Sequence, residues 1–168
     1  MRFRGWNRGF TTIELIVAVI VILIAAAFCV KPVNGFLQRL KLQNAADGIK
    51  HFVLNARIRS VSNPDRPCGV VFRVHPGSTT DDTVFAFLEK DPPDKRYVQG
   101  QDSLYLAPLV IKKKDQIDIS IPAGLPSEVV FRGDGSASVS AKLALKLKGF
   151  ADTLDILAST GRVKVMKH

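Results

Sequence analysis

Apolar residues are concentrated near the N-terminus of this chain. Residues 10–30 form an almost continuous apolar run, and its one charged residue is Glu14. At 1.5 Å per residue, a helix of this length extends about 30 Å, which matches the hydrocarbon core of a bilayer. A carboxylate in such a segment costs roughly 2.5–3.5 kcal/mol on insertion scales, so it needs a partner. The pattern predicts a membrane-spanning helix over residues 10–30.

Beyond Pro32 the pattern becomes amphipathic. Apolar residues recur every three or four positions between residues 42 and 56, and charged residues take the other faces. Pro32 and Gly35 are expected to kink the helix without ending it. Because a proline disfavours helix at the preceding residue, Pro64 is expected to end it. Residues 31–63 are therefore predicted to form the amphipathic second half of one long helix.

After residue 67 the apolar period changes to two, which is typical of β-strands. Strands are predicted at residues 68–75, 83–90, 104–112, 115–121, 128–132 and 138–148, the third of them interrupted by Pro108. Residues 154–158 and 162–166 are expected to form a hairpin across a loop that contains Gly161. The predicted fold class is α+β, with a long N-terminal helix, membrane-spanning in its first half, packed on a small antiparallel β-sheet domain over residues 64–168.

A short basic leader precedes the apolar run. Residues 1–9 contain three arginines and no acidic residue, and they end in Gly9. An ordinary secretory signal is cut at a small-residue site after its apolar stretch, and residues 25–28 match such a site poorly. The change in composition lies instead between Gly9 and Phe10.

The sequence Gly9-Phe10-Thr11-Thr12-Ile13-Glu14-Leu15 resembles the type IV prepilin signal. The resemblance implies that a prepilin peptidase cuts between Gly9 and Phe10 and methylates the new Phe10 amine. It also implies that Glu14 is an assembly residue, because in such pilins this glutamate faces the free amine of a first residue. The arginines keep the leader cytoplasmic, so we expect a single-pass protein of the bacterial inner membrane with a periplasmic C-terminal domain. The alternative for this segment is a plain signal anchor.

Residues farther along the chain resemble one particular family of pilin-like proteins. The segments at residues 55–57, 70–72, 130–135, 143–145, 154–156 and 160–165 look like the GspH/FimT family of minor pilins and pseudopilins. This implies a structural subunit of a type II secretion pseudopilus or a type IV pilus, with other pilins or pseudopilins as filament partners. The expected divisions are the leader at 1–9, the assembly helix at 10–30, its amphipathic half at 31–63, and the β-rich domain at 64–168.

The C-terminal hairpin suggests an alternative function in natural DNA uptake. FimT-type subunits resemble it through a Gly-Arg-x-Arg motif that contacts DNA. Here the motif reads Gly161-Arg162-Val163-Lys164, and lysine lacks the bidentate fork of the second arginine. Arg162, Lys164 and Lys167 are the candidate DNA-binding residues, and their contacts would be salt-dependent and independent of sequence. The competing interpretation is that Gly161 makes the turn and the cations are solvated.

Composition and other motifs add little to this picture. The 168 residues carry a net charge of +9, or +6 without the leader, which favours an anionic partner although basic exported proteins are common. Two cysteines do not make a disulfide framework. Because no nucleophile elbow, P-loop or dinucleotide motif occurs, we predict neither an enzyme nor a cofactor. Asp91, Asp94 and Asp102 flank a proline-rich loop, but such carboxylates are usually solvated, so no metal site is predicted.

Overall fold

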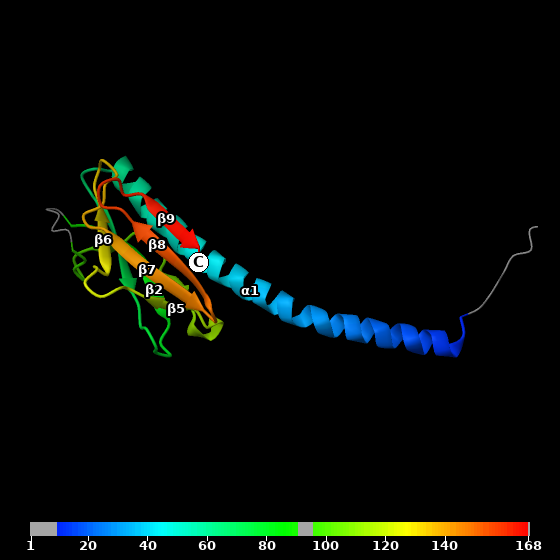
Figure 1. Cartoon of the computed structure of the whole chain (residues 1–168). Helices are drawn as coiled ribbons and strands as arrows, with labels where there is room; N and C mark the ends of the chain where they lie inside the picture. The colour runs from blue at the N-terminus through cyan, green and yellow to red at the C-terminus, as the bar shows by residue number, and fades with distance from the viewer. Residues whose placement is uncertain (1–9, 91–95, 168) are drawn as a thin grey trace, which may run out of the picture. The chain divides into compact units, whose positions relative to one another are not determined.

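The computed structural model describes residues 10–90 and 96–167, except for the side chains of residues 27–32. The chain divides into two compact units, Met1–Leu37 and Gln38–His168. Helix α1 (Thr12–Ser62) contributes residues to both units, and all nine described strands belong to the second (Figure 1). The end of α1 at Ser62 is where Pro64 was expected to place it.

The predicted fold class is wrong in its membrane-spanning helix. Within the described residues, no helix is long and apolar enough to cross a membrane. The side chains described at the start of α1 form an apolar stretch of about 15 residues, fewer than the roughly 20 that a membrane-spanning helix needs. The second described stretch, residues 33–62, has about 30 residues and carries polar and charged side chains throughout.

The β-rich part contains two antiparallel sheets where one small sheet was predicted. The first sheet has the order β3-β2-β1-β6, and β4 also pairs with β2. The second has the order β5-β7-β8-β9. The strands of the first sheet are β1 (Cys68–Arg73), β2 (Asp82–Leu88), β3 (Ser103–Leu104), β4 (Leu109–Ile111) and β6 (Glu128–Phe131). Those of the second are β5 (Asp118–Ser120), β7 (Ala141–Leu147), β8 (Phe150–Ile156) and β9 (Val163–Lys167).

One apolar core joins the second part of α1 to the inner faces of both sheets. The buried helix face consists of residues spaced three or four apart, and the strands contribute alternate residues, as their periods require. The helix residues are Leu42, Ala46, Ile49, Val53 and Ala56. Complete burial of a leucine, isoleucine or valine side chain is worth about 1.5–3 kcal/mol, so this shared core organises the whole second unit.

A serine fixes the end of α1 to the start of β1. The Ser60 hydroxyl accepts a hydrogen bond from the Cys68 backbone N–H at 2.7 Å and donates to the Cys68 carbonyl oxygen at 3.3 Å. Both residues are fully buried. Burial raises the pKa of the Cys68 thiol to about 12, so this cysteine is a protonated core residue and not a nucleophile.

The two sheets are linked by backbone hydrogen bonds through the segment after β6. The Ser138 N–H donates to the Val130 carbonyl oxygen at 2.7 Å, which covers the free edge of β6. The N–H of the preceding residue, Ala137, donates at 2.9 Å to the carbonyl oxygen of Ala158, which lies two residues after the end of β8 in the second sheet. This segment therefore satisfies backbone groups at the ends of both sheets.

The largest difference from the predicted strand boundaries is in β8, which was predicted to begin at residue 154. Strand β8 begins at Phe150, and Gly149, with φ of +90°, makes a tight turn after β7. The predicted interruption of the strand over residues 104–112 is confirmed, since residues 105–108 separate β3 from β4 and Pro108 cannot donate a ladder hydrogen bond.

Candidate functional site

The start of α1 is a reciprocal capping box. The Glu14 carboxylate oxygen Oε2 accepts hydrogen bonds from the Thr11 backbone N–H and from the Thr11 hydroxyl, each at 2.8 Å. The Glu14 N–H donates back to the Thr11 hydroxyl oxygen at 3.3 Å. This arrangement satisfies donors that a helix start leaves free. The predicted assembly residue therefore holds the first turn of its own helix.

The apolar side chains that follow Thr11 are uncovered in this chain. Phe10, the predicted first residue of the processed chain, is 86% exposed. The exposed large apolar side chains continue from Ile13 to Ile24 and point to every side of the helix. Gly9, the other predicted processing residue, lies outside the described residues. A monomeric soluble protein rarely exposes a contiguous apolar surface of this kind, so this segment requires a cover.

The C-terminal hairpin has the expected strand pairing, but its three cations do not share one face. Val163 is buried and Val165 packs against the core, while Arg162 and Lys164 are exposed. Lys167 lies an even number of residues after Val163 and Val165 in β9, so its side chain is on the same face as theirs and on the face opposite to Lys164. The structure therefore brings Arg162 and Lys164 together and leaves Lys167 apart.

An acidic residue lies beside Lys164 on the outer face of the second sheet. The strand register places Lys142, Asp155 and Lys164 in one row across β7, β8 and β9. Lys142 Nζ lies 3.4 Å from Asp155 Oδ1. The carboxylate partly neutralises this row, which makes it less favourable for a phosphate backbone than a row of cations alone.

Gly161 has a steric role in the hairpin. Its φ is +59°, and an added Cβ would lie 2.0 Å from the Gly135 carbonyl oxygen and 3.0 Å from Arg57 Nε. Arg57 Nε in turn donates a hydrogen bond to the same Gly135 oxygen at 2.8 Å. The loop before β9, the loop after β6 and the last turns of α1 thus meet at one point, which only glycine fits.

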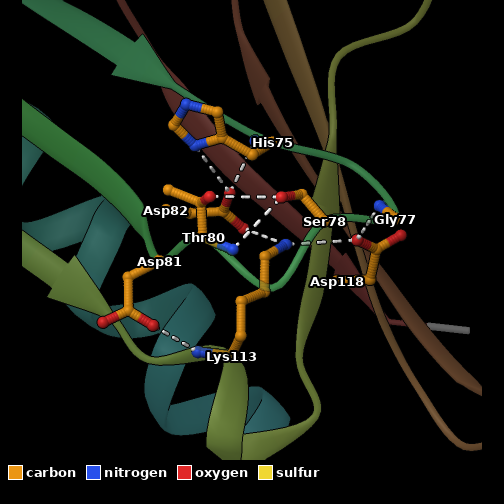
Figure 2. Close-up of polar contacts among 8 residues, drawn as sticks. All are labelled: His75, Gly77, Ser78, Thr80, Asp81, Asp82, Lys113 and Asp118. Carbon is orange, nitrogen blue, oxygen red and sulfur yellow. Dashed lines mark hydrogen bonds and ion pairs between the residues drawn. The ribbon is translucent and has the colours of Figure 1, made fainter.

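A second polar cluster surrounds Asp82 at the start of β2 (Figure 2). Asp82 is fully buried, and its Oδ2 accepts a hydrogen bond from Lys113 Nζ at 2.8 Å. Its Oδ1 accepts a hydrogen bond from the His75 backbone N–H at 2.7 Å and lies 3.8 Å from His75 Nδ1. Lys113 Nζ also donates to Asp118 Oδ1 at 3.3 Å, and the Lys113 backbone N–H donates to Asp81 Oδ1 at 2.8 Å.

These contacts attach the turn around η1 (Lys113–Asp115) to β2 and β5. Burial by itself would lower the pKa of Lys113. Hydrogen bonds and negative charge from Asp82 and Asp118 outweigh that effect, so the pKa of Lys113 is raised. The ammonium and the carboxylates are engaged with one another, and the cluster acts as a clamp between loops.

Sequence patterns do not predict this cluster, although one signal for it is present. Asp82 lies two and four residues before Val84 and Ala86 in β2, so its side chain is on the same face as theirs, and both of those face the core. An aspartate at such a position needs a buried partner. The partner, Lys113, cannot be found from composition, because the turn that directs its side chain inward is not encoded in a local pattern.

Asp102, one of the three carboxylates near the proline-rich loop, binds backbone N–H groups. Asp102 accepts hydrogen bonds from the backbone N–H groups of Lys90 and Val98, at 2.9 and 2.6 Å. Asp91 and Asp94 lie outside the described residues. In the part of the chain that the structure describes, no three His, Cys, Asp or Glu residues are arranged to hold a metal ion.

Comparison of the chain with protein-family models, curated proteins and solved structures found no match.

Replacement of Gly161 by alanine is expected to lower the free energy of unfolding by about 2–4 kcal/mol, because it adds a left-handed backbone cost to a collision with the Gly135 oxygen. Gly149→Ala is the matched control, since Gly149 also has positive φ but open space around its Cα; its cost is about 1–2 kcal/mol. Urea unfolding measures both. Equal losses would contradict the steric role of Gly161.

Substitution of Lys113 by methionine is expected to destabilise the fold by about 3 kcal/mol, because it leaves the buried Asp82 charge uncompensated. Lys114→Met, at an exposed neighbour, should stay within about 0.5 kcal/mol. The raised pKa of Lys113 means that its stabilisation is complete below the ordinary lysine pKa of about 10.4 and decreases as the pH rises through the raised value. Urea unfolding of both variants at neutral and alkaline pH tests this, and a Lys113→Met cost independent of pH would contradict it.

Proposed function

We propose that this chain is a structural subunit of the minor pilin or minor pseudopilin type. Its partners are a prepilin peptidase and the N-terminal helices of other pilins or pseudopilins. Processing leaves Phe10 as a methylated first residue, and the helix that follows enters a filament. The β-rich domain, residues 64–168, is the exported part.

The uncovered apolar surface from Phe10 to Ile24 carries this proposal. Glu14 is the only charged residue in residues 10–26, and apolar side chains surround it. Equivalent helices from other subunits offer apolar cover on every side. They also offer a cation, because each processed chain brings the free amine of its first residue, which suits a carboxylate among apolar neighbours.

The resemblance of residues 9–15 to a prepilin signal is a second, independent support. It connects the apolar surface to a processing step that creates the required amine. The DNA-uptake alternative has less support, because Lys167 is separated from Lys164 and Asp155 lies in the row of Lys164.

The processing step gives the first test. In cells that contain the prepilin peptidase, the intact mass and the N-terminal peptide are expected to show a chain that begins at Phe10 with one added methyl group. Without the peptidase, the leader should remain. Gly9→Leu is expected to block cleavage, whereas Gly5→Leu, at the other glycine of the leader, should leave it unchanged. A chain that keeps residues 1–9 in the presence of the peptidase, or one cut beyond Ala27, would refute the proposal.

The assembly step gives a second test through Glu14→Gln. Glutamine also serves in a capping box, so this variant retains the hydrogen bonds with Thr11 and removes only the charge. We expect normal processing and at least about a tenfold loss from the filament fraction, because a partner amine loses its charged acceptor. Quantitative immunoblotting of sheared filaments measures the loss. Unchanged incorporation would show that the charge has no part in assembly.

A further inference from the structure

The outer face of the first sheet has a small aromatic cluster of its own. Phe85 and Phe87 alternate along β2 with the core residues of that strand, so they point away from the main core. The Tyr97 ring meets both in edge-on geometry, with ring centroids 5.0 Å from Phe85 and 5.2 Å from Phe87. Phe87 lies over Gly69, where an added Cβ would be 2.3 Å from its ring. The cluster therefore packs against β1 at Gly69.

The segment that carries Tyr97 is also fixed. The Tyr97 backbone N–H donates a hydrogen bond to Glu128 Oε2 at 3.3 Å, and the next N–H, of Val98, is held by Asp102. Tyr97 thus has contacts to β2 through its ring and to β6 through its backbone. A surface built on it is preorganised, which reduces the entropic cost of binding.

An open cavity of about 170 Å³ lies beside this cluster. It faces the region where β3 and β4 both pair with β2. Its apolar walls are Phe85, Tyr97, Leu104 and Pro108. Leu104 is 57% exposed although its side chain contributes to the wall. Apolar surface in this cavity is therefore accessible from outside.

Arg73 gives the cavity a positive charge. Its guanidinium carbon lies 5.2 Å from the centroid of the Phe85 ring, in cation–π geometry. Arg73 is exposed and belongs to the lining, and none of the described lining residues is acidic. The cavity thus combines apolar walls with an accessible cation.

The size and composition of the cavity indicate what it fits. Sites for small-molecule ligands usually measure about 300–1,000 Å³, so a cavity of about 170 Å³ suits a single apolar side chain. Aromatic residues and arginine around an apolar depression are typical of the energetically dominant centres of protein interfaces. A second copy is the less suitable occupant, because the chain has a net charge of +9 and like charges oppose association.

We propose that this cavity is a docking site for an acidic segment of a partner protein. The segment inserts one aliphatic side chain between Tyr97 and Leu104 and places a carboxylate beside Arg73. The site does not depend on the proposed filament function, since it lies wholly within the second unit and uses none of residues 10–26.

Titration of the purified full chain with the peptide acetyl-Glu-Leu-Glu-amide tests this site. We expect saturable changes in the NMR methyl signals of Leu104 and Thr83, which both line the cavity. Acetyl-Lys-Leu-Lys-amide and acetyl-Glu-Ala-Glu-amide, which lack the charge or the aliphatic anchor, should bind at least about tenfold more weakly. The same loss is expected for Arg73→Glu and for Leu104→Asp, both at exposed positions, whereas Lys114→Glu should change little.

Three results would overturn the site. They are the absence of saturable methyl changes with the acidic leucine peptide, equal affinity for the three peptides, and unchanged affinity in both cavity variants. Equal binding of the two acidic peptides, with a loss in Lys114→Glu, would mean that only the general positive charge of the chain attracts them. None of these results bears on processing at Phe10, so the two proposals fail separately.

Discussion

The buried face of α1 between Leu42 and Ala56 is the constraint on which the rest of the second unit depends. Several strands have only two or three residues, and sheets built from such short strands are not stable without a packed face. Both sheets turn their apolar faces to the same core, which includes this helix face. Loss of the helix would expose both inner faces at once, so helix and sheets form one cooperative structure.

Where the two sheets meet, backbone hydrogen bonds connect them in addition to the apolar core. The segment after β6 satisfies groups of both sheets, and Gly135 and Gly161 allow the adjoining loops to touch. Arg57 completes the junction from the helix side through its bond to the Gly135 oxygen. The structural role of Gly161 explains why a glycine stands there. In the Gly-Arg-x-Lys sequence, only the side chains of Arg162 and Lys164 are then left to contact a ligand.

The sequence predicted features that arise from local periodicity. The end of α1 before Pro64, the alternation in β7 and the β8–β9 hairpin follow from rules that act over a few residues. The inward turn of Lys113 toward Asp82 and the contact of Gly161 with Gly135 depend on residues 31 and 26 positions apart. The division into two sheets depends on more distant pairs, such as Cys68 with Phe131, 63 positions apart. Periodicity carries no information about such pairs. The membrane-spanning helix was inferred from an almost continuous apolar run, and no helix among the described residues is long and apolar enough to be one.

The capping box changes the interpretation of Glu14. An acceptor at this position is sufficient to hold the first turn, because the cap uses Oε2 for both bonds from Thr11. Glutamine would serve equally well in that role, so the cap alone accounts for an acceptor and leaves the negative charge unexplained. A charge surrounded by exposed apolar side chains becomes unfavourable once those side chains are covered, unless the cover supplies a cation. The remaining oxygen, Oε1, takes no part in the bonds to Thr11. The intrachain cap and an amine from a neighbouring subunit are therefore compatible, with one oxygen for each.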